Sequence, residues 1–156
     1  MGKCVFCDRE SEKTIYANDA FHTKFDAFPV SPGHALVIPN RHVLTIAELT
    51  DDEWALLKPA ILETTKIIES TDFSEFYSSF IHTPDEKTAK FSGKMLEHVG
   101  VSKNPDGYNI GVNLGVAAGQ TIEHLHLHII PRYTGDTEAA TGGIRQVVPE
   151  LADYTD

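Results

Sequence analysis

Three histidines at alternate positions, His124, His126 and His128, are the residues best suited to chemistry in this sequence. Side chains at i, i+2 and i+4 of a β-strand project from one face. The spacing predicts a strand over 122–130 that aims three imidazoles in one direction, about 6.5–7 Å apart, while the intervening aliphatic side chains enter the core. That separation admits a phosphate between neighbouring rings. A neutral imidazole is a good nucleophile near pH 7, so the pattern is suited to covalent catalysis.

Two other interpretations of the three histidines stand beside this one. They could be surface residues of a half-exposed strand, or they could bind a metal ion together, because alternating histidines on a strand can ligate zinc. The residues on either side of the histidines favour neither of these two interpretations. Gly119-Gln120-Thr121 precedes the histidines and Ile129-Ile130-Pro131-Arg132 follows them.

Cys4 and Cys7, the two cysteines of the chain, form a single Cys-x-x-Cys. In a cytosolic protein this spacing indicates metal or redox chemistry more than a structural disulfide. A structural zinc ion would need two further ligands. The alternative is a pair of reduced, unligated thiols, and a redox role is less favoured because no helix begins clearly at Cys4.

The composition limits the classes of partner. The chain has 156 residues, which favours one domain, and its 13 basic and 23 acidic side chains give a net charge of −10. Such a surface disfavours a broad nucleic-acid interface but allows a small phosphorylated ligand in one pocket. No apolar run approaches the roughly 18 residues that cross a bilayer, and no long apolar signal segment opens the sequence. We therefore expect no membrane partner and a cytoplasmic protein.

The first half of the chain predicts short strands over 14–17 and 21–25, and a buried strand over 35–38 that Pro39 ends. Thr50 to Glu53 has the capping-box pattern. A helix is expected from there to about residue 70, with apolar residues at helical spacing: Trp54, Leu57, Ile61 and Ile68. Pro59 should kink or break this helix.

The second half predicts another capping box over 83–86, with Pro84 at the first helical position and a helix through about His98. A strand over 108–113 follows, and the long strand over 122–130 is stopped by Pro131. Strands, then helices, then strands favour an α+β fold with an antiparallel sheet.

Residues 119–132, Gly-Gln-Thr-Ile-Glu-His-Leu-His-Leu-His-Ile-Ile-Pro-Arg, resemble the signature of the histidine triad (HIT) family of nucleotide hydrolases and transferases. Further family segments occur in the same order: Cys4-Val5-Phe6-Cys7, Asp26, Pro32-Gly33-His34, Leu36-Val37-Ile38-Pro39, Arg41-His42 and 108–113. The resemblance implies a HIT-like fold with an antiparallel sheet of about five strands and packed helices. It covers about 4–70 and 104–135, so 71–103 is expected to be an insertion within one HIT domain.

The tail over 133–156, with Gly142-Gly143-Ile144-Arg145, resembles the bacterial branch that is grouped with diadenosine polyphosphate hydrolases. Family members usually pair into homodimers that merge their sheets, so a homodimer is expected here as well.

The resemblance also implies a mechanism. His124, His126 and His128 would form the catalytic triad, with His126 attacking the α-phosphorus of a nucleoside phosphoryl compound. Water would then release a nucleoside monophosphate. His128 and the Gln120-Thr121 turn would meet the charge on the phosphoryl oxygens.

Three further residues match positions that support the nucleotide. Asp26 would accept hydrogen bonds from ribose hydroxyls, Asn113 would touch the phosphate or support the turn, and His34 would buttress the triad. Each has a plainer alternative: a turn-stabilising carboxylate, a strand cap and a core histidine, respectively. Gln120, likewise, could act only through its backbone. Lys24 departs from the family pattern, which has an apolar residue in this wall of the base pocket.

Several bacterial members of the family complete a zinc site around the cysteine pair. The matching ligands here are Cys4, Cys7, His42 and His124, and the zinc would be structural. No organic cofactor is implied.

The function that follows is hydrolysis of a nucleoside phosphoryl bond, with an adenine nucleotide as the substrate class. A nucleotidyl transferase or phosphorylase is the alternative within the same chemistry. His128 favours hydrolysis, because glutamine at this position is common in the uridylyl-transferase branch. A non-catalytic nucleotide- or zinc-binding regulator is the alternative from a different class.

Overall fold

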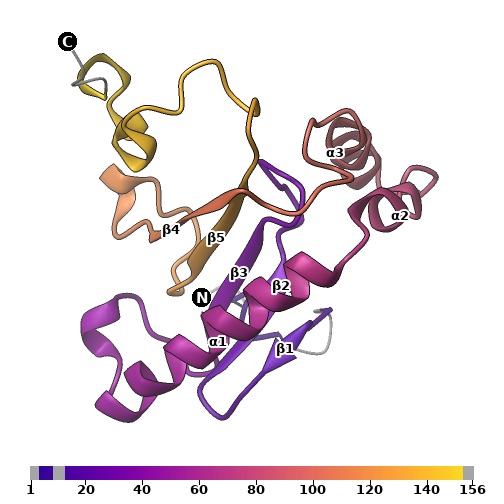
Figure 1. Ribbon diagram of the computed structural model, residues 1–156. Coiled ribbons are helices and arrows are strands. Elements are labelled where there is room, and N and C mark those ends of the chain that lie inside the picture. Colours follow the sequence, from indigo (N-terminus) through magenta and orange to yellow (C-terminus); the bar gives the residue numbers. More distant parts are fainter. Residues whose placement is uncertain (1–3, 9–12, 153–156) are drawn as a thin grey trace.

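The computed structural model describes residues 4–8 and 13–152. Five strands form one open antiparallel sheet in the order β1-β2-β3-β5-β4 (Figure 1). The strands are β1 Tyr16–Ala17, β2 Phe21–Phe25, β3 Ala35–Pro39, β4 Gly107–Val112 and β5 Leu127–Arg132. The predicted α+β fold with an antiparallel sheet of about five strands is confirmed.

β5 is the last strand in the chain but lies inside the sheet, between β3 and β4. Leu127 and Ile129 belong to the main core cluster, together with Leu57 of the long helix α1. In β3, Ala35 and Val37 belong to this core as well. Leu36 and Ile38 belong to a second cluster, on the opposite face of the strand. The histidine-bearing segment therefore enters the middle of the sheet, with one face towards α1 and the other free to form a site.

The start of the predicted strand over 122–130 was wrong, because β5 begins at Leu127. Val37 of β3 and Val112 of β4 both pair with Leu127, so the two neighbouring ladders end there together. Before that point the chain turns, and the His124 N–H donates to the Ile122 carbonyl at 2.8 Å. His124 consequently precedes the sheet and does not continue the register of His128.

Pro131 does not stop β5 as expected but lies within it, opposite Tyr108 of β4. The ladder to β3 ends at the pair Ala35–Ile129. On that side of β5 the Pro131 carbonyl accepts a 2.7 Å hydrogen bond from the Ser31 hydroxyl. The N–H and C=O of one strand residue point to the same side of the strand. The N–H that Pro131 lacks would therefore point to the side where the ladder to β3 has already ended, and no ladder hydrogen bond is lost.

Helix α1 spans Asp51–Ser70. Pro59 was expected to kink or break this helix, and the helix continues through it without a break. The proline removes the hydrogen bond to the Ala55 carbonyl, but Ala55 is exposed and water can replace it. The capping box is confirmed, since Thr50 and Glu53 each accept from the other's backbone N–H. The buried face is Leu57, Ala60, Thr64 and Ile68. Trp54, expected on this face, is 54% exposed.

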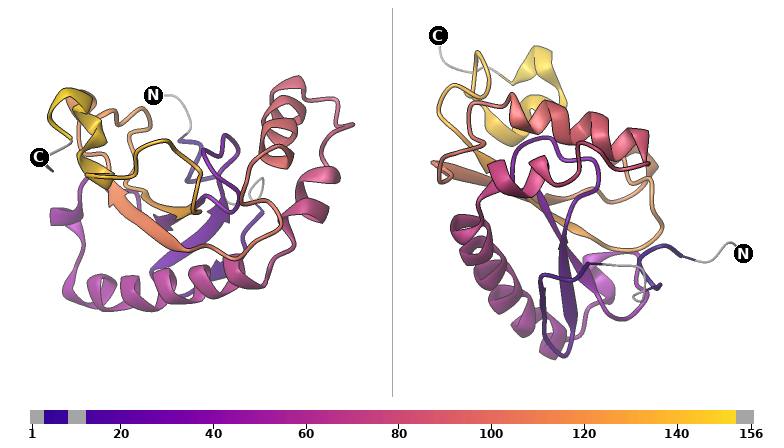
Figure 2. Two further views of the ribbon diagram at one scale, coloured as in Figure 1. Left: turned by 45° about the horizontal axis from the view of Figure 1, so that its top comes forward. Right: turned by 90° about the vertical axis from the view of Figure 1, so that its right-hand side faces the viewer.

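Two shorter helices follow, α2 over Phe73–Ser78 and α3 over Glu86–Leu96. The N-cap of α3 is Asp85, whose side chain accepts from the Lys87 N–H, so the predicted start at 83–86 was two residues early. Figure 2 shows α2 and α3 together beyond the end of α1, beside the loop between β2 and β3. Whether 71–103 is an insertion stays a prediction.

Short 3-10 helices cover Ile46–Glu48, Val116–Ala118, Gly143–Val147 and Pro149–Leu151. Among the helices in the described part of the chain, none combines the length and apolar character needed to cross a membrane. The homodimer expected from the resemblance is not tested by a single chain and stays a prediction.

Candidate active site and metal site

A pocket of about 350 Å³ opens on the face of the sheet away from α1. It contains four of the predicted site residues: Asp26, Thr121, His126 and His128. The rest of its wall is mostly apolar, formed by Val5, Phe6, Lys24, Ala27, Phe28, Leu36 and Ile122. A largely apolar cavity with a few convergent polar groups is typical of a small-molecule site.

The protonation of His126 follows from its hydrogen bond. Its Nδ1 lies 2.8 Å from the carbonyl oxygen of His124, and a carbonyl can only accept, so Nδ1 carries the proton. In the neutral ring, Nε2 is then unprotonated and holds a lone pair. No group of the described residues forms a hydrogen bond with this Nε2, and the ring lines the pocket. His126 therefore offers the pocket a nucleophilic nitrogen.

His128 has the opposite tautomer, set by His34 behind it. The Val30 N–H donates to Nδ1 of His34 at 3.3 Å, so His34 carries its proton on Nε2. That Nε2 donates to Nδ1 of His128 at 3.0 Å, which leaves the His128 proton on Nε2. This N–H is buried and has no partner among the described residues. An unpaired buried donor costs about 1–3 kcal/mol, and a ligand oxygen in the pocket would remove that cost.

Burial keeps the rings of His34 and His128 neutral. It lowers the pKa of His34 to about 4; the carboxylate of Asp26, 3.6 Å from Nε2, opposes the shift and His128 adds to it. The pKa of His128 is also lowered, first by burial and then by the neighbouring His126. The tautomers deduced for His34 and His128 therefore apply at neutral pH.

Asp26 directly follows β2, and its carboxylate both stabilises a turn and lines the pocket. One carboxylate oxygen accepts from the Phe28 N–H at 2.8 Å, as a turn-stabilising carboxylate would. The other faces His34, and the residue lines the pocket. The turn contact leaves acceptor capacity for ligand hydroxyls, since a carboxylate has about four lone-pair sites.

The remaining predicted nucleotide residues lie outside the pocket lining. The amide oxygen of Gln120 accepts from the Gly115 N–H at 2.8 Å, and its amide nitrogen donates to the Leu44 carbonyl at 3.3 Å. The Gln120 side chain thus braces its own loop. Asn113 is half-buried just after β4 and is not among the lining residues. His34 reaches the pocket only through His128.

Phe6 is a pocket residue that sequence reasoning did not single out. It is 5% exposed, and its ring packs edge-on against His126 at 5.2 Å and His124 at 5.9 Å between centroids. Lys24, noted as a departure from the family, places Nζ 5.8 Å from the centre of the Phe6 ring. The sequence did offer a signal for Phe6, since it lies between Cys4 and Cys7. A metal ion bound by both cysteines would hold the Phe6 backbone in place.

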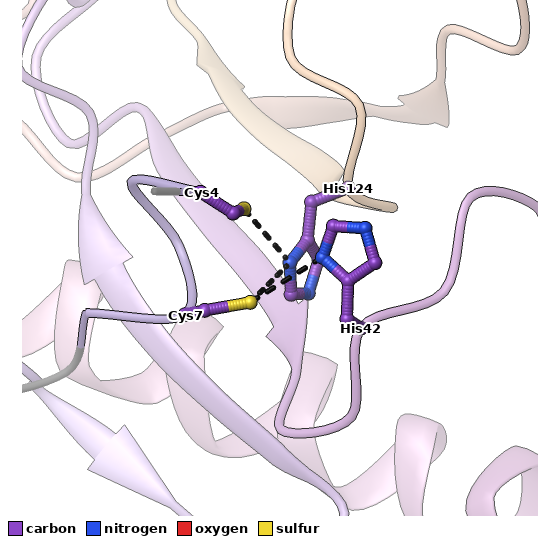
Figure 3. Close-up of side chains that lie close together, drawn as sticks. All are labelled: Cys4, Cys7, His42 and His124. Atoms are coloured by element: carbon purple, nitrogen blue, oxygen red, sulfur yellow. Dashed lines mark hydrogen bonds between the residues drawn. The ribbon is translucent and has the colours of Figure 1, made fainter. Parts of the chain in front are cut away.

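The four predicted metal ligands converge from three separate segments (Figure 3). Sγ of Cys4 lies 3.4 Å from Nδ1 of His124, and Sγ of Cys7 lies 3.3 Å from Nδ1 of His42 and 3.6 Å from Nδ1 of His124. A tetrahedral zinc ion with usual bond lengths separates sulfur and nitrogen ligands by about 3.6 Å. The donor set and its spacing fit such an ion.

His124 is prepared for this cluster by its own hydrogen bond. Its Nε2 lies 3.0 Å from the Pro39 carbonyl and must donate to it, which leaves the Nδ1 lone pair towards the cysteines. Burial lowers the pKa of this ring, and the side chain is fully buried. The ring of His124 therefore belongs to the cysteine cluster, and the residue meets His126 through its carbonyl oxygen.

A family model described as HIT domain matches residues 8–135 of the chain. The chain belongs to the HIT family. An uncharacterised HIT-like protein of Methanocaldococcus jannaschii is 28% identical over 90% of the chain and 87% of its own length.

Two relatives with named activities are also similar. An AP-4-A phosphorylase of Mycobacterium tuberculosis is 32% identical over 80% of the chain, which spans about half (49%) of the phosphorylase. An adenosine 5'-monophosphoramidase of Schizosaccharomyces pombe is 30% identical over 83% of the chain and 74% of its own length. Nucleotide-processing enzymes are thus among the HIT relatives.

Two solved structures share the fold. A HIT family member from Bacillus subtilis superposes with a TM-score of 0.59 at 27% identity, covering 86% of this chain and 77% of that one. A Zn-bound histidine triad family protein from Mycobacterium smegmatis superposes with a TM-score of 0.54 at 26% identity, covering 88% of this chain and 80% of that one.

Proposed function

We propose that this HIT protein hydrolyses nucleoside phosphoryl compounds, dinucleoside polyphosphates or nucleoside phosphoramidates, through a nucleotidyl-histidine intermediate on His126. One observation carries the proposal: a lone pair on His126 and an unpaired N–H on His128 line the same pocket. A phosphoryl group needs both, because its phosphorus accepts a nucleophile while its oxygens accept hydrogen bonds.

In the first step, the Nε2 lone pair of His126 forms a bond to the α-phosphorus, and the bond from phosphorus to the leaving group breaks. A polyphosphate leaves as an anion, whereas an amine leaves with a proton from solvent. In the second step, the oxygen of a water molecule attacks the phosphorus and the P–Nε2 bond breaks. The electron pair returns to His126, the water protons pass to solvent, and a nucleoside monophosphate is released.

The other pocket residues act by positioning. The His128 N–H donates to a phosphoryl oxygen, and His34 holds that tautomer through the 3.0 Å hydrogen bond to Nδ1. The free lone pairs of Asp26 accept from ribose hydroxyls. An adenine nucleotide is the expected substrate, in line with the names of two relatives.

We further propose that zinc is bound by Cys4, Cys7, His42 and His124. With four protein ligands the ion has no open position, so it supplies structure and not chemistry. It would hold the segment that carries Phe6 against the pocket. The name of the Zn-bound relative from Mycobacterium smegmatis is consistent with this proposal.

A phosphorylase is the second candidate, supported by the 32% identity with the AP-4-A phosphorylase. Phosphate would then replace water in the second step and release a nucleoside diphosphate. The same His126 intermediate serves both reactions, so the product separates the two candidates.

The test incubates the protein with adenosine phosphoramidate and with diadenosine tetraphosphate, each with and without inorganic phosphate. Hydrolysis predicts AMP in all reactions, whereas a phosphorylase predicts phosphate-dependent ADP from the dinucleotide. His126→Ala should lower turnover at least about 1,000-fold. The exposed His82 provides the control His82→Ala, which should keep full activity.

Equal turnover by wild type and His126→Ala would remove the catalytic claim. No turnover by wild type, together with tight AMP binding, would favour the non-catalytic regulator. An adenylyl adduct in the intact-protein mass after alkaline quenching, which preserves a P–N bond on histidine, would support the covalent step.

A further inference from the structure

A second cavity of about 290 Å³ lies next to the reaction pocket, between β2 with its flanking segments and the helical part of the chain from α2 to α3. Five aromatic side chains line it, from β2, α2, the turn after α2, and α3: Phe25, Phe76, Tyr77, Phe80 and Phe91. The catalytic scheme above uses none of these rings. A cavity walled by several aromatic rings suits a flat ligand that can stack.

The walls are already assembled by ring-to-ring packing. Phe25 and Phe76 pack edge-on with centroids 5.1 Å apart, and Phe76 and Phe80 do so at 5.2 Å. The hydroxyl of Tyr77, which is buried, accepts from the Gly33 N–H at 3.2 Å. The α2 segment is thereby fixed to the loop between β2 and β3, so the cavity needs little reorganisation to accept a ligand.

The two cavities share part of one wall. Lys24, Asp26 and Ala27 line both of them. Phe28 lines the reaction pocket and packs edge-on, at 5.3 Å, against Phe91 of the second cavity. A single ligand that extends past Asp26 and Ala27 would therefore enter both.

A basic side chain accompanies each cavity, in a chain with a net charge of −10. Nζ of Lys13 lies 5.1 Å from the centre of the Phe80 ring in the second cavity. Nζ of Lys24 lies 5.8 Å from the centre of the Phe6 ring in the reaction pocket. Cations beside stacking surfaces match a ligand that combines an aromatic ring with an anionic linker.

We propose that this aromatic cavity binds the second nucleobase of a dinucleoside polyphosphate, with the polyphosphate linker passing Lys24. The proposal rests on the proposed function and narrows its substrate class to nucleotides with a nucleoside in the leaving group. Nucleotides with a small leaving group fill only the reaction pocket.

The test compares two substrates that share the adenylyl group and differ in the leaving group: diadenosine tetraphosphate and adenosine phosphoramidate. Truncation of one stacking ring, in Phe80→Ala or Phe91→Ala, should lower kcat/KM for the dinucleotide about 5- to 150-fold, which corresponds to about 1–3 kcal/mol. For the phosphoramidate the change should stay below about twofold.

Two more variants control for folding and for occupancy. Trp54→Ala removes an aromatic side chain that is 54% exposed and lines neither cavity, so the ratio of the two kcat/KM values should not change. Thr88→Phe adds bulk to the cavity wall and should act as the truncations do, against the dinucleotide alone. Equal losses on both substrates, or no loss on either, would overturn the proposal.

A binding measurement that does not depend on catalysis distinguishes failure of this proposal from failure of the proposed function. In a His126→Ala background, calorimetry should give tighter binding of diadenosine tetraphosphate than of AMP, and the added Phe91→Ala substitution should remove most of that difference. If wild type cleaves neither substrate but this difference appears, the proposed function fails and the cavity assignment stands. Equal affinities for the two ligands in the His126→Ala protein would overturn the assignment.

Discussion

The carbonyl oxygen of His124 accepts a 2.8 Å hydrogen bond from Nδ1 of His126. The ring of His124 lies in the cysteine cluster, and the ring of His126 lines the pocket. Phe6 makes a second connection, because it stands between two candidate metal ligands in the chain and packs on His126. The cluster of cysteines and histidines and the pocket are therefore connected through two short paths.

Removal of the metal should affect both stability and nucleotide binding. Loss of a ligand held at 100–1,000 times its Kd costs about 3–4 kcal/mol, which lowers Tm by about 6–16 °C in a chain of this size. AMP affinity should fall roughly tenfold, as when groups that orient a site are lost. Scanning calorimetry and AMP titration, before and after chelation, measure the two effects.

Cys7→Ser is the matched variant for this prediction, because it removes one thiolate while the residues of the pocket wall stay in place. Zinc added back should restore wild type and leave Cys7→Ser weakened. Unchanged AMP affinity in fully metal-free protein would contradict the coupling.

Stability should fall in mild acid because of His34. Burial lowers its folded-state pKa to about 4, from an ordinary value of 6.5. Between those two pH values the unfolded chain binds more protons than the folded one, so the free energy of unfolding rises with pH across the window. The contribution is fully present above about pH 6.5 and lost by about pH 4, to the extent of about 3 kcal/mol.

Urea unfolding between pH 7.5 and 4.5 measures this dependence, with His34→Gln as the comparison. The substitution removes the titrating ring, so the stability difference from wild type should shrink as the pH falls. Any metal released by acid is released from both proteins, and the comparison cancels it. A difference that is constant over the whole range would contradict the assignment.

Two glycine-to-alanine substitutions should act in opposite directions. Gly33 has φ of +83°, and a Cβ there would lie 2.8 Å from the ring of Phe73. We expect Gly33→Ala to destabilise the protein by about 3 kcal/mol, from backbone strain and overpacking together. Gly93 lies inside α3, and a Cβ there would meet nothing within 4 Å beyond the adjacent residues and the helix's own backbone, so Gly93→Ala should stabilise by about 0.5–1 kcal/mol.

Thermal and urea unfolding of the two variants give these values. Gly33→Ala should also weaken AMP binding, because Gly33 directly precedes His34, which orients His128. If Gly33→Ala left the stability unchanged or raised it, the account of the turn before β3 would be wrong.

Much of the local structure could be predicted because its causes are local. The capping box at Thr50 fixed the start of α1, and the aliphatic alternation placed Leu127 and Ile129 in the core. The sequence of residues 122–130 does not show where the neighbouring strands β3 and β4 end. The strand over 122–130 was therefore predicted too long at its start, and Pro131 was wrongly expected to end it.

Residue type and spacing alone narrowed the chemistry: alternating imidazoles suited to covalent catalysis or to a metal ion, and paired thiols suited to metal or redox chemistry. The tertiary structure decided how the three rings are divided. The turn before β5 sends His124 to the cysteines, while His34, 94 residues away, sets the tautomer of His128. It also formed the aromatic cavity from rings of β2, α2 and α3. Hydrogen-bond partners and cavity walls come from residues distant in the chain, and no local pattern specifies which of them will meet.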